Sequence, residues 1–110
     1  MQLSVSNEQI DIARLRETAQ EASRLLKALA NADRLLLLCQ LSQGERHVSE
    51  LEALLGIRQP TLSQQLGVLR DERLVVTRRE GKNIYYRIAS PQALAVIRTL
   101  YEQYCGGGAK

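Results

Sequence analysis

Two helical segments separated by a tight turn restrict the fold of this chain more than any other feature of its sequence. Ser49 and Glu52 have the spacing of a capping box, in which each side chain satisfies a free backbone N–H at a helix start, so we expect a short helix over 50–55. Gly56 can adopt the positive φ that ends such a helix. We expect a second helix over 60–72, because Pro60 suits the first turn of a helix. This succession is typical of a helix-turn-helix.

The segments on either side predict the rest of the domain. Apolar residues recur at helical spacing before and after the turn, and two β-branched and aromatic stretches indicate a hairpin. We expect a helix over 10–30, or two with a break near 18–20, a buried central helix over 32–41 capped by Asn31, strands over 74–79 and 84–89, and a last helix from Ser90 to about Cys105. The predicted fold class is therefore mainly α with a two-stranded β-hairpin, a winged helix-turn-helix. We expect residues 1–105 to form one domain and residues 106–110 to form a flexible tail.

The composition favours a dimer. The chain has 110 residues with four Tyr but no Phe and no Trp, so it lacks the large side chains that usually enlarge a small core. Burial between two copies can supply what one copy lacks. The longest apolar run, at 35–39, is far shorter than the roughly 20 residues that cross a bilayer. Because the N-terminus also has no signal pattern, we expect a cytoplasmic protein with no membrane partner.

Positive charge is concentrated in one part of the chain. Residues 56–90 contain seven Lys and Arg against three Asp and Glu, whereas the remainder contains eight against nine. A basic segment in a nearly neutral protein indicates a surface that contacts a polyanion.

The second helix of the helix-turn-helix has a polar face suited to base edges. Its side chains carry hydrogen-bond donors, acceptors or a methyl group for thymine, and Arg70 lies off the buried stripe near its end. The candidate DNA-binding residues here are Gln59, Thr61, Ser63, Gln64, Gln65 and Arg70. Taken alone, this face could also be the solvated side of an ordinary amphipathic helix.

The predicted hairpin strengthens the assignment to double-stranded DNA. Arg78, Arg79 and Lys82 cluster at its tip, where a wing lies along phosphates or in the minor groove. Tyr85 and Tyr86 alternate on a strand, so one packs inward while the other reaches phosphate or shields the sheet. A protein-interaction module without DNA binding is disfavoured because it requires neither the polar face nor the basic tip.

Four motifs in order make the sequence resemble the ArsR/SmtB family of small dimeric bacterial repressors. They are ALANADRL at 28–35, VSEL at 48–51, QPTLSQQL at 59–66, and RREGK at 78–82 with YY at 85–86. The resemblance implies a winged-helix homodimer with its first and last helices at the interface. It also implies binding to an imperfect palindromic operator that is released when an inducer arrives. Gln65 replaces a histidine common in the family, and Arg58 replaces a small capping residue. These departures affect which operator is bound.

The only histidine, His47, does not support a metal site or an active site. Zinc normally takes four ligands, and His47, Cys39 and Cys105 are too few and too scattered for a dedicated site. Catalysis would require a nucleophile with a partnering base, and His47 has no recognisable Ser or Cys partner. We therefore expect no metal, no cofactor and no enzymatic activity, and we interpret His47 as a surface or packing residue.

The two cysteines resemble those of the sulfide- and redox-responsive branch of the family, that of the BigR, SqrR and HlyU repressors. The resemblance implies that Cys39, late on the central helix, and Cys105, at the end of the last helix, cross-link when oxidised. The inducer is then a reactive sulfur species or another thiol oxidant. A polysulfide bridge tolerates a wider gap than a direct disulfide, which needs Cα atoms roughly 4.4–6.8 Å apart. Two alternatives stay open, namely inert cysteines and an ArsR-type sensor of a metal or metalloid.

Overall fold

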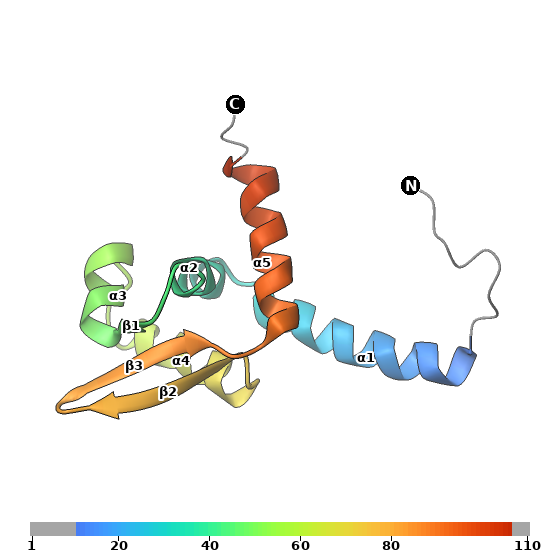
Figure 1. Ribbon diagram of the computed structural model, residues 1–110, viewed down its shortest axis with the longest axis horizontal. Helices are drawn as coiled ribbons and strands as arrows, with labels where there is room; N and C mark the ends of the chain where they lie inside the picture. Colours follow the sequence, from blue (N-terminus) through green and yellow to red (C-terminus); the bar gives the residue numbers. More distant parts are fainter. Residues whose placement is uncertain (1–10, 107–110) are drawn as a thin grey trace.

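The computed structural model describes residues 11–106 and has the order of elements expected for a winged helix-turn-helix. The fold consists of five helices and a small antiparallel sheet, and the β2–β3 hairpin extends from one side of the body (Figure 1). The elements are α1 (Ile12–Leu29), α2 (Ala32–Leu41), β1 (Arg46–His47), α3 (Val48–Leu55), α4 (Thr61–Asp71), β2 (Val75–Glu80), β3 (Asn83–Ile88) and α5 (Pro91–Tyr104). No helix of this described part is long and apolar enough to span a membrane.

Helix α1 is one uninterrupted helix that projects away from the body of the domain (Figure 1). Only Ala28 and Leu29, at its C-terminal end, are buried. Earlier in the helix, the apolar residues Ile12, Leu15 and Leu26 are 57%, 49% and 58% exposed. Because α1 is continuous, the predicted alternative of two helices with a break near 18–20 is wrong. Ile10, where the predicted helix starts, lies outside the described residues.

Helix α2 is the centre of the hydrophobic core. The Asn31 side chain caps it by accepting a hydrogen bond from the backbone N–H of Arg34 at 3.0 Å, as predicted. Leu37 and Leu38 are completely buried. Helix α2 packs against α1, α3, α4 and α5, so it connects every other helix of the domain.

The sheet has three strands, not the two that were predicted. Residues Arg46–His47 form β1, which pairs antiparallel with β3 so that His47 lies opposite Tyr85. A two-residue strand is too short to show alternating hydrophobicity, so the pairing arises only from the tertiary fold. The hairpin itself was predicted correctly, with Glu80 opposite Asn83 and Gly81 at φ 63° in the turn.

The start of α3 differs from the prediction. The helix begins at Val48, and the Glu50 carboxylate accepts a hydrogen bond from the backbone N–H of His47 at 2.9 Å. The capping box predicted for Ser49 and Glu52 is therefore displaced by two residues. The tight turn that follows is as expected, because Gly56 ends α3 in the left-handed conformation at φ 71°.

Helix α5 begins at the predicted proline. The Ser90 hydroxyl accepts a hydrogen bond from the N–H of Ala93 at 3.0 Å, and Ala93 and Ile97 are buried against the core. Tyr104, in its last turn, is 83% exposed. The predicted flexible tail lies outside the described residues except for Gly106, which is half-buried.

Candidate DNA interface and thiol pair

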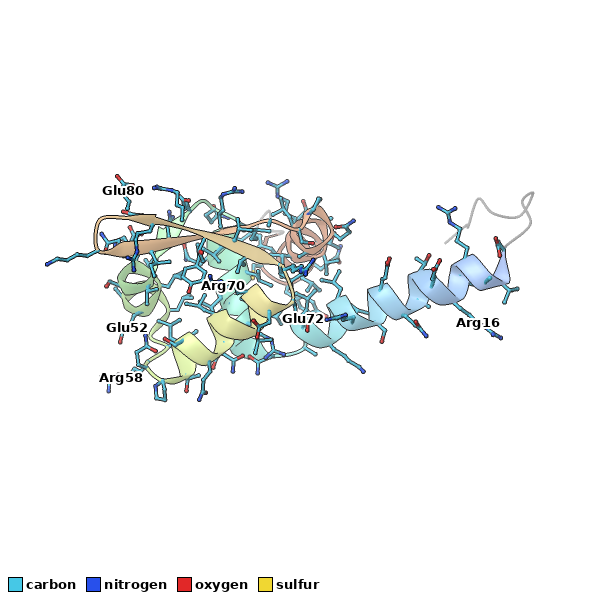
Figure 2. All side chains as sticks on the ribbon, turned by 90° about the horizontal axis from the view of Figure 1, so that it is seen from below. Arg16, Glu52, Arg58, Arg70, Glu72 and Glu80 are labelled. Carbon is cyan, nitrogen blue, oxygen red and sulfur yellow. The ribbon has the colours of Figure 1, made fainter. Side chains whose placement is uncertain are left out.

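Helix α4 presents a polar face to solvent because its three leucines point into the core. Leu62, Leu66 and Leu69 have at most 1% of their surface exposed. Ser63 and Gln64 are exposed on the opposite side, and Arg70 is exposed near the end of the helix. Figure 2 looks onto this helix, with Arg58 before its first turn and Arg70 near its last. An exposed polar helix beside a basic hairpin is suited to the major groove of DNA.

Two further residues of the predicted set lie at the start of α4. The Gln59 side chain is exposed, and its Oε1 accepts a hydrogen bond from the backbone N–H of Ser63 at 3.1 Å. Thr61 is half-buried. Gln59 therefore helps to cap α4 in addition to facing solvent.

Gln65 does not lie on the exposed face where the sequence analysis placed it. It is half-buried and points toward α2, where its Oε1 accepts a hydrogen bond from Nη1 of Arg34 at 2.8 Å. The spacing of the leucines left the position of Gln65 ambiguous, because it lies one residue before Leu66 at the border of the buried stripe. The contact with Arg34 decides its orientation.

The three basic residues of the wing have different surroundings. Arg78 forms ion pairs with Glu45 at 2.8 Å and with Glu80 at 2.7 Å, and its guanidinium lies 4.5 Å from the centre of the Tyr85 ring. The hydrogen bonds to Glu45 and Glu80 raise the pKa of Arg78, and the hydrogen bond from Arg78 lowers the pKa of the Glu45 carboxyl. Arg79 and Lys82 are exposed, and neither forms an ion pair within residues 11–106.

His47 packs against the wing, which agrees with its interpretation as a surface or packing residue. Its ring meets the Tyr85 ring edge to face, with 5.2 Å between the centroids. Tyr86, the neighbour of Tyr85, packs against the hydrophobic core. In the described part of the chain, no three His, Cys, Asp or Glu side chains are grouped so as to hold a metal ion.

The two cysteines lie late on α2 and directly after α5, and these two helices pack against each other. Cys39, late on α2, is a half-buried free thiol against the core, and Cys105, which follows α5, is an exposed free thiol. Burial raises the pKa of Cys39, and the negative charge of a nearby Cys105 thiolate raises it further. Cys39 and Cys105 are 66 residues apart in the sequence, and the packing of α2 against α5 brings their two elements together.

Arg34 and Glu45 were not identified as site residues from the sequence. Arg34 contacts α4, and Glu45 contacts the wing, in both cases across more than 30 residues. One signal was available for Arg34, since it is the only basic residue in an otherwise largely apolar helix. Glu45 lies in a short polar connection and offers no comparable signal.

Comparison with known proteins identifies the family. Residues 31–77 match the sequence model of a protein family that is described as bacterial regulatory protein, arsR family. The biofilm growth-associated repressor of Agrobacterium fabrum is 53% identical over 97 residues, which cover 88% of this chain and 83% of the relative. The similarity therefore extends over most of both chains and is not limited to the helix-turn-helix.

Solved structures agree with the sequence match. The transcriptional repressor BigR from Xylella fastidiosa superposes with a TM-score of 0.80 at 44% identity, covering 88% of this chain and 99% of that one. Reduced HlyU from Vibrio cholerae superposes with a TM-score of 0.80 at 39% identity, covering 84% and 97%. These relatives are transcriptional regulators and not enzymes. The chain belongs to the arsR family of bacterial regulatory proteins.

Proposed function

We propose that this protein is a homodimeric transcriptional repressor that releases its operator when reactive sulfur species link Cys39 to Cys105. The observation that carries the sensing part is the thiol pair itself. A half-buried thiol late on the central helix and an exposed thiol at the end of α5 belong to two helices that pack against each other. The similarity to the repressors of Agrobacterium fabrum and Xylella fastidiosa supports repression as the output.

The exposed apolar residues of α1 support a dimer. Ile12, Leu15 and Leu26 leave a large apolar area in water on a helix that projects from the body. Such a surface is usually covered by a protein partner. Tyr101 and Tyr104 extend the same kind of surface along α5. A second copy that covers both helices accounts for these exposures, and a two-fold dimer matches a palindromic operator.

The DNA interface in this proposal consists of α4 and the tip of the wing. The side chains of Ser63 and Gln64 face the base edges of the major groove. Arg70, Arg79 and Lys82 contact phosphates. Thr61 and Gln59 lie at the N-terminal end of α4, where helix backbone N–H groups also favour a phosphate.

The sensing chemistry begins at the more accessible thiol. The Cys105 thiolate attacks the terminal sulfur of an organic persulfide, which transfers an SH group to Cys105 and leaves as a thiolate. The Cys39 thiolate then attacks Sγ of the Cys105 persulfide, and hydrosulfide leaves as the disulfide forms. If Cys39 is itself persulfidated first, the same attack produces a bridge with an additional sulfur atom.

A bridge between α2 and α5 changes DNA binding through the geometry of the dimer. Helix α2 contacts α4, and α5 belongs to the proposed dimer interface, so a covalent link between them shifts α4 relative to the two-fold axis. The two α4 helices must lie about 34–36 Å apart to enter successive major grooves. A small rotation spoils that separation and lowers operator affinity.

The test uses the reduced protein and an operator selected from random duplexes. Binding is measured by fluorescence anisotropy before and after treatment with an organic persulfide, and again after a reductant. We expect release and recovery, with mass spectrometry showing linked Cys39 and Cys105 peptides that carry zero or more additional sulfur atoms. Release without linked peptides contradicts the bridge, and release only by a metal or metalloid ion assigns the alternative sensor class.

A further inference from the structure

Arg34 joins three helices through one guanidinium group. Its Nε donates to the carbonyl oxygen of Ala28, and its Nη2 donates to that of Lys27 at 3.3 Å, both in the last turn of α1. Its Nη1 donates to Oε1 of Gln65 in α4 at 2.8 Å. The residue itself lies in the first turn of α2.

These partners match what a guanidinium binds well. The last carbonyl groups of a helix have no partner within the helix and carry partial negative charge, so a cation stabilises them. The planar fork of arginine can donate in several fixed directions at once, which a lysine ammonium cannot reproduce. Arg34 is half-buried, so water competes less for these bonds than at an exposed site.

Helix α4 needs a directional contact of this kind. Leu62, Leu66 and Leu69 bury one side of α4 in the core, and apolar contacts are non-directional. A hydrogen bond has a preferred angle, so the bond to Gln65 restrains rotation of α4 about its own axis. The neighbouring residue, Gln64, is exposed on the face proposed to read bases, and any such rotation displaces it.

We propose that Arg34 is a positioning residue that orients α4 for operator recognition, with Gln65 as its partner and not as a base-reading residue. This inference rests on the proposed DNA binding by α4. Loss of either Arg34 or Gln65 should then lower operator affinity about as much as loss of both. The affinity for random DNA, which is bound mainly through its phosphates, should depend much less on the orientation of α4.

The experiment compares full-length Arg34→Gln, Gln65→Leu and the double variant with the unsubstituted protein. Affinity for the selected operator and for a random duplex of equal length is measured by fluorescence anisotropy, and thermal melting monitors folding. We expect each single variant to bind the operator about tenfold more weakly, and the double variant to lose about the same factor and not about a hundredfold. Affinity for the random duplex should change less than about twofold, with an unchanged salt dependence.

Gln65→Glu separates the two possible roles of Gln65 without removing its hydrogen bond. A carboxylate still accepts from the Arg34 guanidinium, so we expect operator affinity to be retained. If Gln65 instead faced DNA, the added negative charge would weaken binding to both duplexes. That result would overturn the inference, and so would additive losses in the double variant.

Arg24→Gln is the matched control. Arg24 also joins α1 to the end of α4, through an exposed ion pair with Glu72 at 2.8 Å, and the substitution removes the same charge. We expect almost no effect, because exposed ion pairs contribute little. An equal loss in Arg24→Gln, or equal losses of Arg34→Gln on both duplexes, overturns the specific role of Arg34. Failure of the unsubstituted protein to bind any duplex contradicts the proposed function instead.

Discussion

Nη2 of Arg78 lies 2.8 Å from Oε1 of Glu45, so the wing is tied by an ion pair to the connection that precedes β1. Glu80 neutralises the same guanidinium from the other side. The charge of Arg78 is therefore compensated within the protein, whereas the exposed Arg79 and Lys82 have no such ion pair in the part of the chain that the structure describes. The three basic residues of the wing should consequently differ in what they contribute to DNA binding.

Arg79→Ala and Lys82→Ala should each weaken binding to all DNA sequences. Each removes one phosphate contact, so the slope of log K against log salt concentration should become shallower by about 0.9. Arg78→Ala should change that slope less and should lower the melting temperature, because it removes contacts with Glu45 and Tyr85. Titrations at several salt concentrations measure the slopes. Three equal slope changes would mean that Arg78 leaves its ion pairs to contact DNA.

Gln64→Ala tests whether α4 reads bases. Gln64 is exposed, so its truncation should leave the fold intact while removing hydrogen bonds to a base edge. We expect a loss of about 1–3 kcal/mol on the operator and almost none on a random duplex. Anisotropy on the two duplexes, with Ser49→Ala as an exposed control away from α4, measures the difference. Equal losses on both would show that Gln64 supports the helix without reading sequence.

Cys39→Ser and Cys105→Ser should each bind the operator and remain bound after persulfide treatment. A bridge needs both thiols, so loss of either one should prevent release. A serine hydroxyl at the half-buried position 39 costs about 1–3 kcal/mol if it is unpaired, so melting temperatures must accompany the binding data. A folded Cys105→Ser protein that still releases DNA would assign the switch to modification of Cys39 alone.

The reactivity of Cys39 should depend on pH in a defined direction. Burial and the Cys105 thiolate both raise the pKa of Cys39, so its alkylation rate should reach half-maximum above the usual thiol value of about 8.5. In Cys105→Ser one of these two causes is absent, and the midpoint should move to lower pH. Iodoacetamide labelling followed by peptide mass spectrometry gives both profiles. A midpoint at or below the usual value in the unsubstituted protein would contradict the assigned environment.

Features that depend on neighbouring residues in the chain were predictable from the sequence. The bounds of α2, its Asn31 cap, the Gly56 turn and the start of α5 at Pro91 all follow from local backbone preferences and apolar spacing. The order of the predicted elements indicated the winged-helix architecture and the four motifs indicated the family, and the comparisons confirmed both.

Features that depend on distant partners were decided only by the tertiary structure. Strand β1 exists because β3 offers it hydrogen-bonding partners, and Gln65 points inward because Arg34, 31 residues earlier, donates to it. Arg78 differs from Arg79 because Glu45, 33 residues earlier, lies beside it. A local pattern shows that a side chain is polar or charged. Which partner satisfies that group is determined by the packing of helices and strands, and so is the difference between a residue that meets DNA and one that holds the fold.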